Sequence, residues 1–195
     1  MQESEKRFDP HRKDRLISSE RFARWNPPVF LARFDLRPGM TILDLGCGPG
    51  FWTLPLAELV GPTGLVWAID ASQELLDSLA ERKPPPQVRP RKGTLPNIDL
   101  ASRSVDFAWI ALVFHEVDRP DAVAAETLRV LKPSGRLALL EWRPDGISDH
   151  NPPRDIRITP DQLCTFLSSA GFVDARMTWQ DDDNYLIEAS HPITG

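Results

Sequence analysis

Three glycines at alternate positions follow a short apolar run, and this feature constrains the fold of the chain more than any other. The run TILDL at 41–45 has the length and apolar character of a buried strand. The glycines are Gly46, Gly48 and Gly50, and a helix-forming stretch at 51–60 follows them. Glycine adopts backbone conformations closed to other residues and lets the backbone approach a ligand closely. The sequence therefore predicts a ligand-binding turn between a strand and a helix.

Strand and helix patterns alternate along the rest of the chain. The expected strands lie at 41–45, 65–70, 105–112, 136–142, 172–179 and 184–190, with a short one within 82–93, and the expected helices at 51–60, 72–83, 121–131 and 159–170. In the last helix Thr159 and Gln162 resemble a capping box, and Gly171 ends it. Only QDDD separates the last two strands, which predicts an antiparallel hairpin. The pattern predicts an α/β fold, a doubly wound, mostly parallel sheet with that hairpin at its edge.

Composition and net charge together limit the classes of function that this chain can have. The chain of 195 residues is 41% hydrophobic and 26% charged, which fits one domain with small additions. Its net charge of −5 argues against a general nucleic-acid binder. One basic segment, RKPPPQVRPRKG at 82–93, has two interpretations. It is either a solvated loop around a short strand or a region that attracts an acidic substrate.

Other sequence features indicate a cytoplasmic protein. The longest apolar run, at 107–114, is far shorter than the roughly 20 residues that span a bilayer, so no membrane span is expected. The N-terminus is charged from the third residue and lacks the apolar stretch of a signal peptide. Cys47 and Cys164 are far apart and suggest neither a disulfide framework nor a metal cluster.

Two aspartates near the glycine turn indicate which ligand binds there. Asp70 ends the second strand 20 residues after Gly50, where a carboxylate accepts hydrogen bonds from ribose hydroxyls. The glycines follow G-x-G-x-G rather than the G-x-G-x-x-G of dinucleotide-binding folds. Asp44 precedes them, where a carboxylate would repel a pyrophosphate but attract the ammonium group of an amino acid. These features favour S-adenosyl-L-methionine over a nicotinamide dinucleotide.

With these motifs the chain resembles the class I S-adenosylmethionine-dependent methyltransferases, in particular the small branch that includes ubiquinone-biosynthesis C-methyltransferases. The resemblance covers about residues 38–142. It rests on four segments: LRPGMTILDLGCGPG, VWAID, SVDFAW with the FHEV after it, and ETLRVLKPSGRLALLEW. It implies a Rossmann-like sheet of seven strands and S-adenosyl-L-methionine as cofactor. It also implies a methyltransferase domain over 38–195, preceded by an N-terminal helical lid over 1–37.

The same resemblance assigns the cofactor contacts. They are Asp44, Gly46, Cys47, Gly48, Gly50, Asp70, Ala71, Thr94, Leu95 and Ala111. One segment departs from the family pattern, because Gly93, Thr94 and Leu95 stand where Gly-Asp-Ala is usual. The Thr94 hydroxyl and the Leu95 amide remain available to adenine, whereas a carboxylate for its exocyclic amine is absent.

The chemistry of the cofactor makes a general base optional. A sulfonium already carries an electrophilic methyl group, so the protein mainly aligns the acceptor and excludes water. His115 and Glu116, at the exit of the fourth strand, are the candidate catalytic residues, with His115 as the base. In the alternative interpretation both are structural: His115 caps the following turn, and Glu116 pairs with an arginine.

Candidates for the acceptor pocket come from separate parts of the chain. Glu141 and Trp142 end the fifth strand, and pairing of Glu141 with an arginine is the structural alternative. Phe22 and Trp25 lie in the N-terminal segment, where they line the pocket or anchor the segment to the core. NPPRDIRI at 151–158 is expected to form a rigid cover.

Three functions stay open at this point. The first is methyl transfer to a small-molecule acceptor by in-line displacement, because a compact domain leaves little surface for a macromolecule. The second is a methyltransferase acting on protein or RNA, and the third is a non-catalytic S-adenosylmethionine-binding sensor or partner subunit. Arsenic methylation is rejected, because neither cysteine has a multi-thiol context. The sequence indicates neither the methylated atom nor the oligomeric state.

Overall fold

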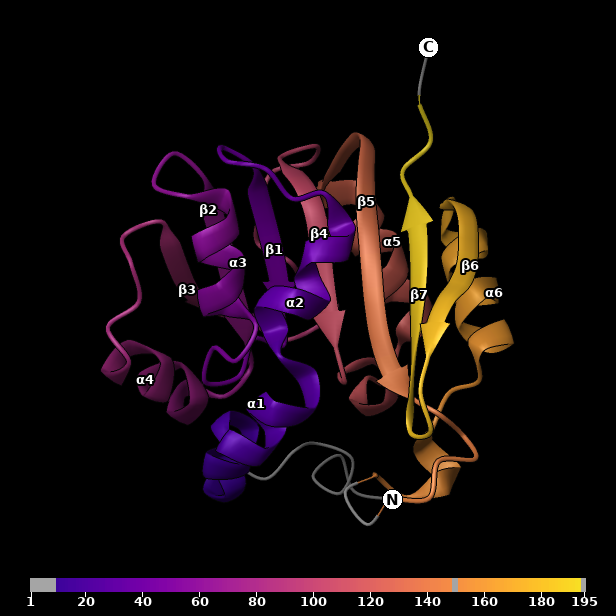
Figure 1. The fold of residues 1–195 in the computed structure, drawn as a ribbon. Coiled ribbons are helices and arrows are strands. Elements are labelled where there is room, and N and C mark those ends of the chain that lie inside the picture. The colour runs from indigo at the N-terminus through magenta and orange to yellow at the C-terminus, as the bar shows by residue number, and fades with distance from the viewer. Residues whose placement is uncertain (1–9, 149–150, 194–195) are drawn as a thin grey trace. The chain divides into compact units, whose positions relative to one another are not determined.

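The computed structural model describes residues 10–148 and 151–193. These residues form two compact units, divided in the chain between Thr94 and Leu95. The N-terminal unit comprises residues 10–94, and the C-terminal unit comprises 95–148 and 151–193. Figure 1 labels the helices and strands of both units.

Three parallel strands form the sheet of the N-terminal unit. They are β1 (Thr41–Leu45), β2 (Leu65–Asp70) and β3 (Val88–Lys92), in the order β3-β2-β1, connected by α3 (Thr53–Val60) and α4 (Gln73–Glu81). The last four residues of β1 are buried, as expected of a strand covered on both faces. Ser72 caps α4, because its hydroxyl accepts a hydrogen bond from the Leu75 amide. β3 is mostly exposed, in line with the interpretation of 82–93 as a solvated segment.

The chain that precedes β1 is helical where the structure describes it. Its elements are η1 (Pro10–Ile17), α1 (Ser19–Trp25), α2 (Pro27–Leu31) and η2 (Ala32–Phe34). Ser18 caps α1, and Asn26, with φ of +40°, separates α1 from the proline that begins α2. Trp25 is 7% exposed and packs edge-to-face with Phe30 and Trp52. The predicted helices are thus present, while their role as a lid stays a prediction.

The C-terminal unit contains four strands in the order β4-β5-β7-β6. Its elements are β4 (Val105–Ala111), η3 (Phe114–Glu116), α5 (Pro120–Val130), β5 (Leu131–Trp142), η4 (Arg154–Ile156), α6 (Pro160–Ala170), β6 (Val173–Gln180) and β7 (Asn184–Ser190). β4 and β5 are parallel, whereas β7 pairs antiparallel with both β5 and β6. α5 contacts β5, α6 contacts β6 and β7, and the two helices pack against each other (Figure 1).

One boundary differs from the sequence prediction. The KPSG turn is expected to precede a strand at 136–142, but β5 already begins at Leu131. Val105 faces Leu131, whereas Phe107 faces Arg136, so the turn residues form an irregularity within the strand pairing. Ser134, with φ of +66°, lies at the point of this irregularity.

The fold class is confirmed. The sheet has seven strands and is mostly parallel, with β6 and β7 forming the predicted antiparallel hairpin. The capping box of α6 is present, with the Thr159 hydroxyl accepting from the Gln162 amide and the Gln162 side chain accepting from the Thr159 amide. Between residues 10 and 193, the helices that the structure describes all lack the length and apolar character needed to cross a membrane.

Candidate functional site

The glycine turn between β1 and α3 is anchored to the end of β2. The amides of Gly46 and Cys47 donate hydrogen bonds to the Ile69 carbonyl at 2.8 and 3.1 Å. Gly50 has a φ of +85°, and a Cβ atom there would lie 2.4 Å from Cδ1 of Leu79. A side chain at Gly50 would therefore be strained and would have to displace Leu79.

Gly48 differs from Gly50 in having space around it. Its φ is +53°, which favours glycine, but the nearest atom to a Cβ placed there is Cδ1 of Leu16, at 3.6 Å. Leu16 belongs to η1, so the N-terminal segment lies over the glycine turn within the same unit.

Asp70 connects the glycine turn with the start of α4. One carboxylate oxygen accepts from the Gly48 amide and the other from the Ser72 amide, both at 2.8 Å. Burial raises the pKa of this carboxyl group, and the backbone amides oppose the shift. An ionised carboxylate offers about four acceptor positions. The half-buried side chain therefore has acceptor positions left for ribose hydroxyls, which fits S-adenosylmethionine.

Asp44 lies behind the glycine turn. It is 1% exposed, and its Oδ2 accepts a hydrogen bond of 2.6 Å from the Thr53 hydroxyl at the start of α3. Burial raises the pKa of its carboxyl group to about 7, Thr53 opposes this shift, and the charge of Asp70 adds to it. The predicted attraction of Asp44 for the ammonium group of the cofactor stays a prediction. An ammonium group close to Asp44 would favour the ionised form of this carboxyl group.

The other predicted cofactor residues of this unit lie around the same turn. Cys47 is buried, and burial raises the pKa of its thiol well above the usual value, so Cys47 is a neutral thiol rather than a nucleophile. Ala71 follows β2 and is exposed, and Thr94 is exposed after β3. Their contacts with a cofactor remain predictions.

In the C-terminal unit, a histidine and a carboxylate form a buried pair. Nδ1 of His115 lies 2.9 Å from Oε2 and 3.1 Å from Oε1 of Glu141. Glu141 is fully buried and also accepts from the amides of Phe114 and Trp142, both at 3.1 Å. Because an ionised carboxylate only accepts hydrogen bonds, Nδ1 carries the proton and Nε2 is the basic nitrogen of neutral His115.

The surroundings of His115 favour its charged form. Burial acts to lower its pKa, but Glu141 and then Glu116 raise it, and the net pKa is above the ordinary histidine value. Glu116 is the more distant carboxylate, with Oε1 3.7 Å from Nε2. Glu141 thus pairs with His115 rather than with the arginine of the structural alternative, while the catalytic role of His115 stays a prediction.

His115 lines a pocket that lies wholly within the C-terminal unit. The pocket has a volume of about 290 Å³. Its walls come from the η3 region, the segment before α6 and α6 itself, and include Phe114, His115, Ile156, Arg157, Ile158 and Phe166. The segment 151–158, expected to be a cover, therefore contributes to a cavity together with the candidate base.

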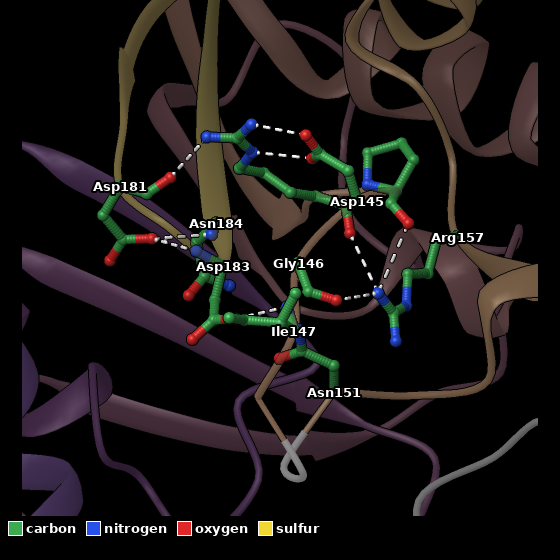
Figure 2. Close-up of polar contacts among 10 residues, drawn as sticks. Asp145, Gly146, Ile147, Asn151, Arg157, Asp181, Asp183 and Asn184 are labelled. Carbon is green, nitrogen blue, oxygen red and sulfur yellow. Dashed lines mark hydrogen bonds and ion pairs between the residues drawn. The ribbon is translucent and has the colours of Figure 1, made fainter.

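Hydrogen bonds tie this segment to the strand ends. Nε of Arg157 donates to the Pro152 carbonyl at 2.8 Å. Its Nη1 donates to the carbonyls of Arg143 and Gly146 at 3.3 and 2.8 Å (Figure 2). Oδ1 of Asp183 accepts from the amides of Ile147 and Ser148 and from Nδ2 of Asn151. This wall of the pocket is thus supported by Asp183, in the turn that precedes β7. Sequence reasoning identified the segment but not Arg157, whose role depends on carbonyls distant in the chain.

The remaining candidates differ in exposure. Leu95, Ala111 and Trp142 are half-buried. Phe22 is 49% exposed and packs its ring edge-to-face with Phe51, while the contacts of Trp25 favour its anchoring role. No group of three or more potential metal-ligating side chains occurs within residues 10–148 and 151–193 as described.

A family model and several solved structures match this chain. A family model described as a methyltransferase domain matches residues 43–139. A SAM-dependent methyltransferase from Aquifex aeolicus is 30% identical, with a TM-score of 0.87 over 95% of this chain and 100% of that chain. The [4+2]-cyclase SpnF is 21% identical, with a TM-score of 0.73 over 91% of this chain and 83% of that chain, which shows a likeness of fold alone.

Curated relatives are longer than this chain. An arsenite methyltransferase from Halobacterium salinarum is 30% identical over 82% of this chain and 40% of that protein. A demethylmenaquinone methyltransferase from Staphylococcus aureus is 34% identical over 70% of this chain and 56% of that protein. The chain thus spans between 40% and 56% of the length of these two relatives.

Proposed function

Because the chain belongs to the S-adenosylmethionine-dependent methyltransferases, we propose that it transfers a methyl group from this cofactor to a small-molecule acceptor by in-line displacement. The observation that carries the proposal is the pocket of about 290 Å³ lined by His115, whose Nδ1 is held by the buried Glu141. Pockets for small molecules typically measure about 300–1,000 Å³, so a cavity of this size suits a compact acceptor or one part of a larger one.

The residues of the chain supply alignment and proton transfer. When bound, the cofactor supplies a methyl group that its sulfonium makes electrophilic. Glu141 accepts a hydrogen bond from Nδ1 of His115 and fixes the ring orientation, which leaves Nε2 to take a proton from the acceptor. The imidazolium that forms is stabilised by Glu141, as the raised pKa of His115 indicates. An acceptor with a hydroxyl or an acidic C–H group needs such a base, whereas an unprotonated amine does not.

The names of relatives support a small acceptor without identifying it. The relatives named demethylmenaquinone methyltransferase are 30% to 34% identical to this chain. The name of the arsenite methyltransferase is not carried over, because Cys47 is buried in the glycine turn and Cys164 lies half-buried in α6. Burial raises the pKa of both thiols, which disfavours the thiolates that bind soft elements. Two free cysteines are compatible with the proposed cytoplasmic location.

The test is a screen of purified protein with S-adenosylmethionine and small quinols, phenols and amines, with S-adenosylhomocysteine release as the readout. We expect turnover with at least one small acceptor, and a rate lowered about 10²- to 10⁴-fold in His115→Gln. His191→Gln is the control, because His191 contacts the Pro192 carbonyl instead of a carboxylate and is half-buried, whereas His115 is buried. Methylation of protein or RNA from an extract, with no turnover of small acceptors, would contradict the proposal.

A further inference from the structure

The N-terminal unit carries an arginine directly beside the glycine turn. Arg21 lies in α1, and the central carbon of its guanidinium is 4.8 Å from the centroid of the Phe51 ring. Phe51 is the residue after Gly50, so α1 packs against the end of the turn. Together with Leu16 near Gly48, this places residues of the N-terminal segment beside the glycine turn.

Arg21 has no anionic partner among the described residues. Its Nε is buried and makes no hydrogen bond within the described part of the chain. Other arginines are paired: Arg37 with Asp35, Arg119 with Asp121, Arg129 with Glu126 and Arg143 with Asp145. Burial, and after it the positive charge of Arg24, lower the pKa of Arg21 to about 10. Arg21 therefore stays protonated at neutral pH in a place that disfavours its charge.

A half-buried cation whose buried Nε has no described acceptor is destabilised, and binding of an anion relieves this cost. The planar guanidinium matches a carboxylate, which accepts two parallel hydrogen bonds from it. Contact with Phe51 restricts the position of the guanidinium in advance, so less freedom is lost on binding. A position next to the glycine turn is where an amino-acid carboxylate of a bound cofactor would lie if Asp44 attracts its ammonium group.

We propose that Arg21 binds a carboxylate, and that this carboxylate is the one on the methionine part of S-adenosylmethionine. A carboxylate on the acceptor is the other source of this chemistry, and the experiment separates the two. The assignment to the cofactor is favoured because Arg21, Phe51, Gly48 and Asp70 all belong to the unit that carries the glycine turn. The inference concerns cofactor binding and does not depend on the identity of the acceptor.

The test compares two ligands by calorimetry. S-adenosylhomocysteine carries the carboxylate, and its decarboxylated analogue keeps the amine and the adenosine but lacks it. In Arg21→Met, which retains an apolar stem over Phe51, we expect the affinity for S-adenosylhomocysteine to fall about ten- to a hundredfold. Affinity for the decarboxylated analogue is expected to be unchanged. The unaltered protein should itself prefer S-adenosylhomocysteine by a similar factor, a result that requires no variant.

Arg33→Met is the matched control. Arg33 also lies over a phenyl ring, with its guanidinium carbon 4.2 Å from the Phe30 centroid, but it is exposed and not beside the turn. We expect it to leave both affinities unchanged. Equal weakening of both ligands in Arg21→Met, or no weakening of either, would overturn the cofactor assignment. If Arg21→Met left the cofactor affinity unchanged but raised the KM for a carboxylated acceptor, Arg21 would bind the carboxylate of the acceptor instead.

Discussion

Nδ1 of His115 lies 2.9 Å from Oε2 of Glu141, although 26 residues separate them in the chain. The parallel pairing of β4 with β5 brings them together, because Ala111 faces Leu140 in the register and both residues follow at the same end of these strands. Glu141 is fixed by two backbone amides as well as by His115. The histidine is therefore held in one orientation and one tautomer, which a general base requires.

The first prediction concerns the pH dependence of methyl transfer. His115 acts as a base when neutral, and its pKa is raised above the ordinary value, so the rate should increase as the pH rises through that pKa. Glu141→Gln removes the nearest negative charge and should move this rise to lower pH, while the rate at high pH falls because the imidazolium loses its partner. Single-turnover rates as a function of pH, with NMR titration of His115, measure both effects.

Glu116→Gln provides the comparison for that experiment. Glu116 is farther from the ring, at 3.7 Å from Nε2, and its replacement should shift the profile in the same direction by less. A profile that is identical in the unaltered protein, Glu141→Gln and Glu116→Gln would mean that His115 does not titrate in the rate-limiting step.

The second prediction concerns the free energy of unfolding. The pKa of Asp44 is about 7 in the folded protein, against an ordinary aspartate value of 3.8 in the unfolded chain, so the folded state binds the proton more tightly. The resulting stabilisation is fully present below about pH 4 and is lost as the pH rises through 7, with an upper limit of about 4 kcal/mol. Asp44→Asn, whose amide oxygen can still accept from Thr53, should remove this pH dependence.

Urea unfolding at about pH 5 and about pH 8.5, on either side of the folded-state pKa, tests this prediction. Asp77→Asn is the control, because Asp77 is exposed and its hydrogen bond with Gln73 lies on the surface. We expect Asp44→Asn to gain stability over the unaltered protein at the higher pH, and Asp77→Asn to change little at either. Equal pH dependence in all three proteins would contradict the raised pKa.

The third prediction separates conformational strain from steric clash at the glycine turn. Gly50 and Gly39 have similar φ values of +85° and +88°, but a Cβ at Gly50 meets Leu79 at 2.4 Å, whereas the nearest atom at Gly39 is at 3.8 Å. We expect Gly39→Ala to cost about 1 kcal/mol from strain alone. Gly50→Ala should cost a further 1–3 kcal/mol, roughly, from the clash.

Thermal or urea unfolding of these variants measures the difference. Leu79 is fully buried, so Leu79→Ala destabilises the core by itself, but Gly50→Ala should cost less in the Leu79→Ala background than in the unaltered protein, because the atom that clashes is absent there. If the two glycine variants lose the same stability, the close approach of Leu79 does not contribute.

The fourth prediction concerns Asp70. Asp70→Ala removes the acceptor proposed for the ribose hydroxyls and also releases the Gly48 amide, so the affinity for S-adenosylhomocysteine should fall at least about tenfold. Asp77→Asn again serves as the control from the same unit. Unchanged affinity in Asp70→Ala would refute the placement of the ribose at Asp70.

Local signals in the sequence account for most of the fold. Thr159 and Gln162 form a capping box because the motif is complete within four residues, and the strand at 41–45 is recovered with the same bounds. The start of β5 was missed because KPSG has turn composition, and its inclusion in the strand depends on pairing with β4.

The candidate site was harder to predict, because its decisive contacts join distant residues. His115 and Glu141 were both identified, but their pairing depends on the register of two parallel strands, and arginines were equally suitable partners on sequence grounds. Arg157 and Arg21 were not singled out, because arginine is common on surfaces. Arg157 matters because it donates to carbonyls of residues distant in the chain. Arg21 matters because its Nε has no acceptor among the described residues.

The most direct test of the account is calorimetric titration of the purified protein with S-adenosylmethionine, S-adenosylhomocysteine and NADH. The glycine turn with Asp70 predicts that the first two bind and that NADH does not. Binding of neither adenosyl compound would contradict the account, because it would mean that the turn, Asp70 and Thr94 do not form a site for this cofactor.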